Sequence, residues 1–375
     1  MRILLSILFI ILTLTFFLIF STSSVAISTI IDFMGQGDLS TGLIYNNTEV
    51  GGLSGITYNP EQQVYYVISD DPSNINKARF YTLKIDLSSG SLTETGVTVI
   101  GVTLLLTETG EPFTKDSLDP EGIAFSGNGI FIVSEGNLYQ NIPAFIKEFS
   151  LEGKLLRSLP IPEKFMNENG NKNQGLRSNL SLESLTLTPD QNYLFTASEN
   201  ALIQDGEIAN LDRGTPSRIL RYNLQTNQPD QEFLYITDPL ANSSFIAEQY
   251  NRQGLVDLLA IDDQHLISLE RSFSLGLGYT IKLFLVNLEQ ADNIQDLPSI
   301  KQANSEIVPA EKTLLLNLNR LNILIDNIEG LTWGSPLPDG GRSLILISDN
   351  NFMSLQTTQI IALRINPNVV SPSGL

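Results

Sequence analysis

The fold is decided by Glu121-Gly122-Ile123-Ala124-Phe125 and by Ile132-Val133-Ser134-Glu135, which follows it after a short turn. An acid opens the first run, another acid closes the second, and both runs are rich in residues that favour strands. The same order recurs at roughly 70-residue intervals, and regular self-similarity indicates a repeat architecture. The five copies begin at Ser54, Glu121, Glu183, Asp257 and Glu329 and end at Asp70, Glu135, Glu199, Glu270 and Asp349.

Each copy is followed by a third β-rich run, such as residues 145–149, and most copies by a fourth. Four short strands per period, separated by turn residues, are typical of a propeller blade. We therefore predict an all-β fold, a single β-propeller of five blades. Six blades are an alternative, if residues 205–251 or 288–322 form an additional blade. A β-sandwich is the alternative, but it gives no reason for the period.

The last copy has only three strands before the chain reaches Pro367 and Pro372. The early strand Ile27–Met34 has no hairpin partner of its own. We expect this N-terminal strand to supply the outer strand of the last blade and to close the ring, because closure removes exposed sheet edges.

The acids of the five copies are predicted to meet at one mouth of the central channel. Residues equidistant from the turn of an antiparallel hairpin are cross-strand neighbours, and the midpoint of Glu121 and Glu135 is Asn128, in a Gly-Asn-Gly turn. Every copy gives a midpoint in or beside a turn, so the acids lie at the open end of each hairpin. If the first strand of each blade lies nearest the axis, these ends face the same mouth. Nine carboxylates result: Asp70, Glu121, Glu135, Glu183, Glu199, Asp257, Glu270, Glu329 and Asp349.

These nine carboxylates are candidate metal ligands. Like charges held opposite one another destabilise a sheet unless protonation, solvent or a cation relieves the repulsion. Oxygen ligands in a chain without cysteine favour Ca²⁺, and less readily Mg²⁺, over zinc. We therefore expect Ca²⁺ and no organic cofactor. The alternative is that the acids accept hydrogen bonds from the backbone of the next blade and only hold the blades together.

Three arginines are candidate substrate-binding groups. Arg79 and Arg218 occupy the same repeat position before the third strand, and Arg271 directly follows Glu270. An arginine at an acidic mouth could bind a phosphate or carboxylate through two hydrogen bonds. The alternative is that it neutralises neighbouring acids.

The charge balance excludes several classes of partner. The formal net charge is −19, from 41 acidic and 22 basic residues. Nucleic acid is not expected as a partner, because affinity for it comes largely from lysine and arginine that neutralise phosphates. The absence of cysteine excludes disulfides and thiolate catalysis. We expect a monomer that acts on a small anionic or ester substrate.

The N-terminus has the pattern of an export signal. One positive charge at Arg2 precedes an apolar run, residues 3–20, and the small residues Ser24-Val25-Ala26 follow. The run is also long enough to span a bilayer, so residues 1–26 are interpreted as a helical signal peptide or an uncleaved membrane anchor, and residues 27–375 as the propeller domain. We expect an exported protein, either periplasmic, extracellular or membrane-anchored and facing outward.

With the repeated elements in view, the chain resembles the phytase-like family, the domain described as having esterase-like activity of phytase. The resemblance covers roughly Ile31 to Pro367. It rests on residues 52–56, 119–123, 182–185 and 327–331, together with the Ile-Ser-Asp and Val-Ser-Glu runs that follow the copies. It implies an exported propeller that hydrolyses a phosphate or carboxylic ester with the help of calcium, and no catalytic residue of the family is carried over.

The expected function is a Ca²⁺-dependent phosphoester or carboxylic ester hydrolase with its acidic site at the channel mouth. In this hypothesis Glu121 or Glu183 is the catalytic base that holds the attacking water. The competing hypothesis is a non-catalytic propeller that binds a ligand, glycan or protein partner at the same mouth. Because a fold alone does not confer catalysis, the sequence leaves open whether the protein is an enzyme.

Overall fold

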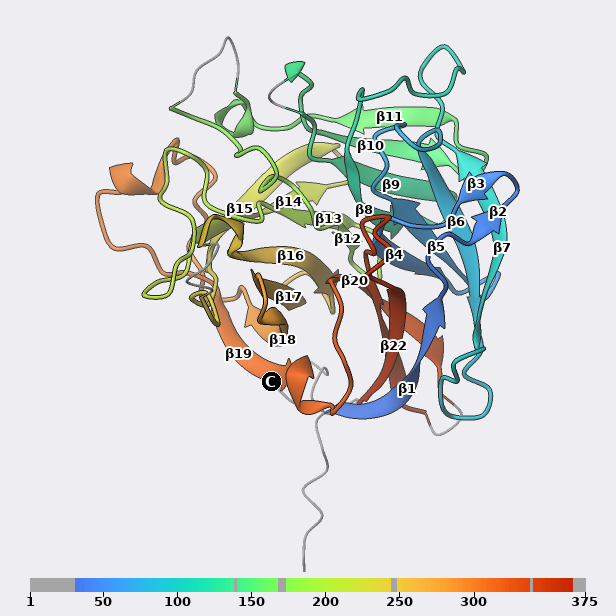
Figure 1. Cartoon of the computed structure of the whole chain (residues 1–375). Helices are drawn as coiled ribbons and strands as arrows, with labels where there is room; N and C mark the ends of the chain where they lie inside the picture. The colour runs from blue at the N-terminus through green and yellow to red at the C-terminus, as the bar shows by residue number, and fades with distance from the viewer. Residues whose placement is uncertain (1–30, 138–139, 168–172, 244–247, 338–339, 367–375) are drawn as a thin grey trace, which may run out of the picture. The chain divides into compact units, whose positions relative to one another are not determined.

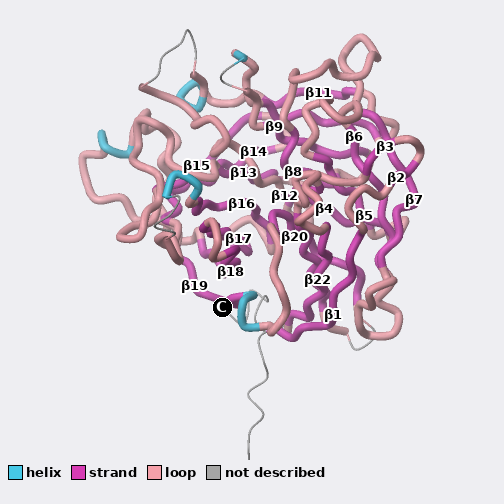
Figure 2. The backbone as a smooth tube through the Cα atoms, viewed as in Figure 1, coloured by secondary structure: helices cyan, strands magenta, loops and turns pink. Residues whose placement is uncertain are grey.

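The computed structural model describes residues 31–137, 140–167, 173–243, 248–337 and 340–366. These residues form five antiparallel four-stranded sheets (Figure 1). Short 3-10 turns are the helical elements of this part, as Figure 2 shows. They are η2 (Glu163–Phe165), η4 (Glu248–Tyr250), η5 (Ile300–Gln302) and η6 (Leu318–Arg320). In the described residues we find no helix long and apolar enough to cross a bilayer.

Each sheet is built from strands that are consecutive in the chain, except the fifth. The first contains β4 (Leu53–Asn59), β5 (Val64–Ser69), β6 (Arg79–Ile85) and β7 (Val97–Leu104). The second contains β8 (Pro120–Phe125), β9 (Gly129–Ser134), β10 (Phe145–Ser150) and β11 (Leu155–Leu159). The third contains β12 (Thr186–Leu187), β13 (Tyr193–Ala197), β14 (Pro216–Asn223) and β15 (Gln228–Ile236). The fourth contains β16 (Arg252–Ala260), β17 (His265–Ser274), β18 (Gly278–Asn287) and β19 (Glu311–Asn317). The fifth contains β20 (Ile328–Pro336), β21 (Arg342–Ser348), β22 (Thr358–Ile365) and β1 (Ile31–Leu39).

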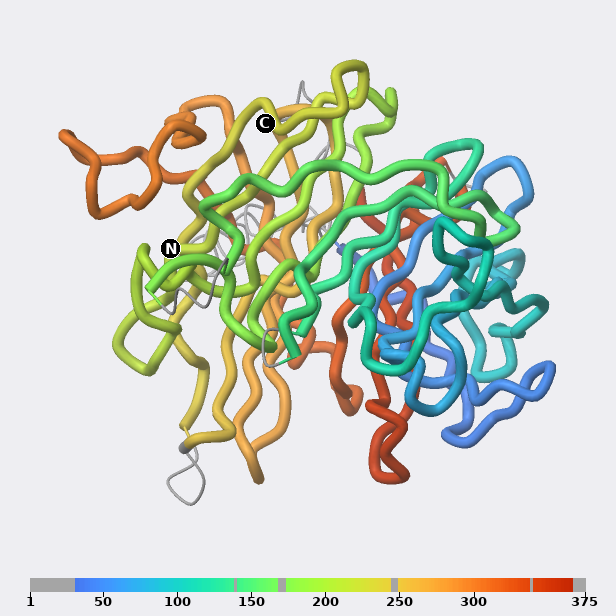
Figure 3. The backbone as a smooth tube through the Cα atoms, turned by 90° about the horizontal axis from the view of Figure 1, so that it is seen from above, coloured from blue at the N-terminus to red at the C-terminus, as the bar shows by residue number. Residues whose placement is uncertain are grey.

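The first strands of the sheets surround a common axis. Strands β4, β8, β12, β16 and β20 contact one another in that order, and β20 contacts β4. The sheet at the red end of the chain therefore lies beside the sheet at the blue end, as Figures 1 and 3 both show. This arrangement is a five-bladed β-propeller. A small separate hairpin, β2 (Ile44–Tyr45) with β3 (Thr48–Glu49), precedes the first blade.

The repeated glycine allows the inner strands to approach one another closely. A Cβ atom at Gly55 would lie 2.7 Å from the carbonyl oxygen of Glu121, and one at Gly122 would lie 2.5 Å from that of Glu183. Such distances are too short for any other residue without a shift of the backbone. The Glu-Gly-Ile motif therefore encodes contact between neighbouring blades as well as the strand itself.

The core lies between the sheets. All residues of β5 and β9 are buried. Between the fourth and fifth blades, Ile267 and Leu283 belong to the same apolar cluster as Leu346 and Leu363. Side chains on both faces of a blade are thus covered by the next blade, which accounts for strands that read as continuous apolar runs rather than alternating ones.

The predicted all-β propeller and its five blades are confirmed. Residues 205–251 hold β14, β15 and η4, and residues 288–322 hold η5, β19 and η6, so neither described part forms a sixth sheet. Strand β1 pairs antiparallel with β22, with Ile31 opposite Ile365 and Leu39 opposite Thr358. The predicted signal or anchor, residues 1–26, lies outside the described residues.

Inter-blade hydrogen bonds to threonine give a stability prediction. The buried Thr186 accepts a hydrogen bond from the backbone N–H of Ala260 in the next blade, at 2.9 Å. Thr186→Val keeps the shape of the side chain but leaves that N–H unpaired, so we expect the free energy of unfolding to fall by about 1–3 kcal/mol in chemical denaturation. Thr98→Val, at an exposed strand position, is the control and should change it by less than about 0.5 kcal/mol. Equal effects would contradict the inter-blade role.

Candidate functional site

A β-bulge in the inner strand sets the position of the first acid in a blade. In the second blade Pro120 pairs with Ser134 and Gly122 with Val133, which leaves Glu121 as the extra residue. The N–H of Glu135 donates to the carbonyl of Asp119 at 2.9 Å. The predicted cross-strand pairing of Glu121 with Glu135 is therefore wrong, because a bulge inserts one residue into a strand. The same bulge falls on Ser54 in β4 and on Glu329 in β20.

In the fourth blade the bulge changes which residue takes the closing position. Leu255 pairs with Glu270, just as Pro120 pairs with Ser134 in the second blade. Glu270 therefore occupies the position of a serine, and Arg271 occupies the position of the closing acid. A shift of one residue turns a strand side chain to the other face of the sheet. The serines at the matching position are Ser69, Ser134, Ser198 and Ser348.

Most of the predicted acids meet in one pocket of about 230 Å³ at the open ends of the hairpins. We call it the acidic pocket. Its carboxylates are Asp70, Glu121, Glu135, Glu183, Glu329 and Asp349. Its other lining residues are Asn179, Arg252, Arg271, Phe273, Tyr279, Asn327 and Asn351. Glu199 lies behind this surface, with Oε1 3.6 Å from Nη2 of Arg271.

Two predicted ligands lie outside the acidic pocket. Asp257 accepts backbone hydrogen bonds from Leu258 and Leu331, both at 2.8 Å, and so joins the fourth blade to the fifth. Glu270 is enclosed between the third and fourth blades. It accepts from Tyr235 Oη at 2.7 Å and from Lys312 Nζ at 2.5 Å. The prediction that Glu270 faces the mouth is wrong, because the fourth copy is offset by one residue. Asp257 lies beside Glu121, Glu183 and Glu329 in a narrow part of the channel.

Of the three candidate arginines, only Arg271 lines the acidic pocket. Arg79 is fully buried and donates to Asp71 at 2.7 Å and to Tyr81 Oη at 2.7 Å. Arg218 is also fully buried and is held between Asp205 and Glu232. The predicted substrate-binding role of these two is therefore wrong, since their guanidinium groups are enclosed and paired within the fold.

Arg271 is paired on one side of the acidic pocket. Its Nη1 atom contacts Glu329 Oε1 and donates to Asn327 Oδ1 at 2.8 Å. Its Nε atom is buried and has no hydrogen-bond partner among the described residues. The guanidinium thus neutralises Glu329 and retains one unused donor.

Three carboxylates form a group suited to a metal ion, and two of them, Asp70 and Glu121, line the acidic pocket. Asp70, Asp119 and Glu121 each offer an oxygen, and these oxygens lie within 4.8 Å of one another. We call them the carboxylate triad. No lysine or arginine pairs with any of the three within the described part of the chain. Sequence analysis missed Asp119, although its signal was present: two acids spaced two residues apart at the start of a strand.

Burial and mutual repulsion raise the pKa values of these acids. Burial raises the pKa of Glu121 well above its usual range, and the neighbouring Asp70 and Glu183 raise it further. Burial, with repulsion from Asp116, raises the pKa of Asp119 to about 6. Burial and the charge of Glu329 raise the pKa of Asp349 to about 8. At neutral pH the pocket therefore favours protonation or a bound cation.

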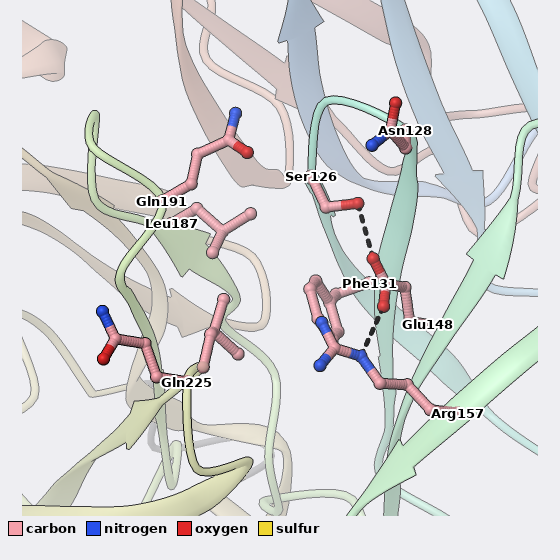
Figure 4. Close-up of a pocket in the computed structure, with 9 residues that line it drawn as sticks. Ser126, Asn128, Phe131, Glu148, Arg157, Leu187, Gln191 and Gln225 are labelled. Carbon is pink, nitrogen blue, oxygen red and sulfur yellow. Dashed lines mark hydrogen bonds and ion pairs between the residues drawn. The ribbon is translucent and has the colours of Figure 1, made fainter.

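Figure 4 shows a second pocket, of about 280 Å³, between the second and third blades. Its charged groups pair with each other: Glu148 accepts from Ser126 Oγ at 2.7 Å and from Arg157 Nε at 2.5 Å. Arg157 also donates to Asn227 of the third blade. We interpret this arrangement as an inter-blade ion pair.

Comparison with known proteins identifies the family. The sequence matches the Phytase-like family, described as "Esterase-like activity of phytase", over residues 48–352. The chain belongs to this family. The match includes the carboxylate triad and every acid of the acidic pocket.

No curated protein matches the sequence. Among solved structures, a thermostable family-43 glycoside hydrolase has 11% identity and a TM-score of 0.43, over 90% of this chain and 95% of the other. The hydrazine synthase of Kuenenia stuttgartiensis has 10% identity and a TM-score of 0.37, over 84% of this chain and 82% of the other. The Dos1 propeller has 8% identity and a TM-score of 0.34, over 85% and 69%. Similarities this low support no inference about this chain.

The raised pKa values predict that, without bound metal, the protein becomes less stable as the pH rises. The pKa of Asp349 is 3.8 in an ordinary setting and about 8 in the fold. A carboxyl whose pKa is raised in the folded protein contributes its full stability at a pH below the pKa of the unfolded chain. This contribution is lost as the pH rises through the pKa of the folded protein. We therefore expect the Tm in chelator to decrease between pH 4 and pH 8, as measured by calorimetry.

Two variants separate this effect from general surface repulsion. Asp349→Asn keeps the oxygen that accepts from the N–H of Asn351 at 2.7 Å but removes the titration, so it should flatten the pH dependence. Asp86 is fully exposed, and hydrogen bonds from Ser88 lower the pKa of its carboxyl. The variant Asp86→Asn should therefore keep the pH dependence of the Tm as steep as in wild type. Parallel curves for wild type and Asp349→Asn would show that Asp349 is not a source of the decline.

Proposed function

We propose that this phytase-like propeller is a Ca²⁺-dependent phosphoester or carboxylic ester hydrolase with its active site in the acidic pocket. The observation that carries the proposal is the carboxylate triad: three acidic oxygens within 4.8 Å of one another, unpaired with any base of the described residues. Across the same pocket, Arg271 supplies positive charge. Membership of a family described by esterase-like activity supports the same reaction class.

The donors of the acidic pocket fit a hard divalent cation. Carboxylate oxygens at 2.3–2.6 Å are the ligands that Ca²⁺ takes in proteins, and the triad supplies one from each of Asp70, Asp119 and Glu121. Glu135 adds a buried Oε2 atom without a hydrogen-bond partner among the described residues. The single histidine, His265, interacts instead with Asp262 at 3.0 Å. We therefore assign the triad as the cation ligands, with Glu135 beside them.

In this proposal the cation, Glu183 and Arg271 have different roles in hydrolysis. A bound Ca²⁺ would offset negative charge on the substrate and polarise the ester oxygen. Glu183 lies in the pocket outside the triad, and burial together with Glu199 raises its pKa. A carboxylate with a raised pKa is suited to hold a water molecule and accept its proton. The guanidinium of Arg271, which lines the pocket, would attract an anionic oxygen of the substrate.

Two further parts of the proposal concern the N-terminus. We propose that residues 1–26 direct export or anchor the protein outside the cytoplasm, and their charge and small-residue pattern supports this. We also propose that β1 closes the ring of blades, a role supported by its pairing with β22 from residue 31 to residue 39. The substrate is proposed to be small and anionic or an ester, and the active form a monomer.

Removal of one triad oxygen is expected to weaken calcium binding. Asp119→Asn exchanges a charged ligand for a neutral one, so we expect a decrease in Ca²⁺ affinity of at least about tenfold in isothermal titration calorimetry. Asp86→Asn makes the same exchange at an exposed position and should bind Ca²⁺ like wild type. Undetectable Ca²⁺ binding by wild type, or unchanged affinity in Asp119→Asn, would rule out the triad as the site.

Removal of the proposed base is expected to affect turnover more than cation binding. For Glu183→Gln we expect kcat on 4-nitrophenyl phosphate or 4-nitrophenyl acetate to fall by about 10²–10⁴-fold, the usual contribution of a general base. Chelator should abolish wild-type activity. Glu152→Gln, at a fully exposed position, is the control. If Glu183→Gln retains wild-type kcat while Asp119→Asn loses activity, the base is a different residue.

A further inference from the structure

The opposite mouth of the channel contains a pocket of different chemistry. It has a volume of about 270 Å³ and is lined by the inner strands of all five blades and by their turns. We call it the turn-side pocket. Its floor is apolar and buried, formed by Ile56, Ile123, Leu185, Leu259 and Leu331. A narrow space of about 10 Å³, lined by Glu121, Glu183 and Glu329 among others, lies between the two mouths.

Aromatic residues form the wall of the turn-side pocket. Tyr58, Phe125 and Trp333 come from three different blades, and each is partly exposed. Trp333 is the only tryptophan of the sequence. Its Nε1 atom donates to the carbonyl of Ala260 in the neighbouring blade at 3.1 Å, which fixes the indole ring and satisfies its polar atom. The ring is therefore available for apolar contact without an unpaired donor.

A cation stands at the edge of this apolar pocket. The guanidinium of Arg342 lies 3.7 Å from the centre of the Trp333 ring. No hydrogen bond or ion pair joins its side chain to another described residue, in contrast to Arg79, Arg218 and Arg271. Glu61, the acid of the turn-side pocket, is exposed and not paired with it. Arg342 is therefore a half-buried arginine without an anionic partner among the described residues.

We propose that the turn-side pocket is a second binding site, for an amphipathic anion. The apolar body of the ligand would contact the floor residues and the Trp333 ring, and its carboxylate or phosphate head would pair with Arg342. A pocket with an apolar floor and a half-buried cation at its edge suits such a ligand, because burial supplies affinity and the charge fixes orientation. Desolvation beside the indole ring strengthens the pairing with an anionic head. The site is separate from the acidic pocket and does not depend on catalysis there.

The single tryptophan makes the proposal measurable on the full chain. Octanoate, octyl phosphate and 1-octanol, each below its aggregation concentration, would be titrated while Trp333 emission is recorded. We expect a saturable change with octanoate or octyl phosphate, and an affinity for 1-octanol about tenfold weaker, since it cannot make the charge-assisted hydrogen bond. The stronger of the two anions identifies the preferred head group. No saturable change with either anion, or equal affinity for 1-octanol, would overturn the proposal.

Variants of Arg342 test the charge directly. Arg342→Gln should lower the affinity for the better anion by about tenfold, to the level of 1-octanol, and leave 1-octanol binding unchanged. Arg213→Gln, which removes an exposed arginine outside the pocket, should bind all three probes like wild type. If Arg342→Gln does not fold, Arg342→Lys is expected to retain most of the preference for an anion. A folded Arg342→Gln with wild-type affinity for the anions would refute the role of Arg342.

Discussion

Repulsion between carboxylates around the channel axis is the constraint that organises this propeller. Unit charges a few ångströms apart interact far more strongly in a partly buried site than in water, and the acidic pocket brings six carboxylates together. On one side Arg271 neutralises part of this charge through its ion pairs with Glu329 and Glu199. On the other side the triad of Asp70, Asp119 and Glu121 has no such partner in the described chain. Arg271, together with the exposed Arg252 at the rim, therefore neutralises only part of the charge of the six carboxylates.

This asymmetry depends on a single change of register. In the first, second, third and fifth blades, a serine at the end of the second β-rich run is followed by an acid. In the fourth blade Arg271 takes the position of this acid, because the bulge falls at Val256 and places Glu270 one position earlier. Glu270 then faces the interface between blades, where Tyr235 and Lys312 satisfy it. The register of one blade therefore sets the electrostatics of the channel, while this blade keeps the four-stranded architecture of the others.

The sequence was sufficient to predict the blades but not the alignment of side chains within them. Period, turns and β-rich runs predicted the five sheets, because each depends only on local sequence. The bulges at Glu121 and Glu329 were not predicted, since these hairpins are buried on both faces and have no regular alternation in which an extra residue would be visible. Burial of Arg79 and Arg218 was also missed, because Asp71 and Asp205, which pair with them, lie in loops whose path is set by tertiary packing. Membership in the family could be proposed from the repeated motifs and is confirmed over residues 48–352.

The same inner-strand motif also explains why the two mouths of the channel differ. In β20 the chain passes from Glu329 through Gly330 and Leu331 to Trp333, and in β8 from Glu121 through Gly122 and Ile123 to Phe125. At about 3.3 Å per residue, four positions span about 13 Å, so one short strand carries an acid at one mouth and an aromatic ring at the other. The first strands of all five blades surround one axis, so the carboxylates of the acidic pocket lie toward one mouth and Tyr58, Phe125 and Trp333 toward the other. Because the glycine after the acid brings neighbouring inner strands into close contact, the two mouths are separated by a narrow part of the channel, with a space of only about 10 Å³.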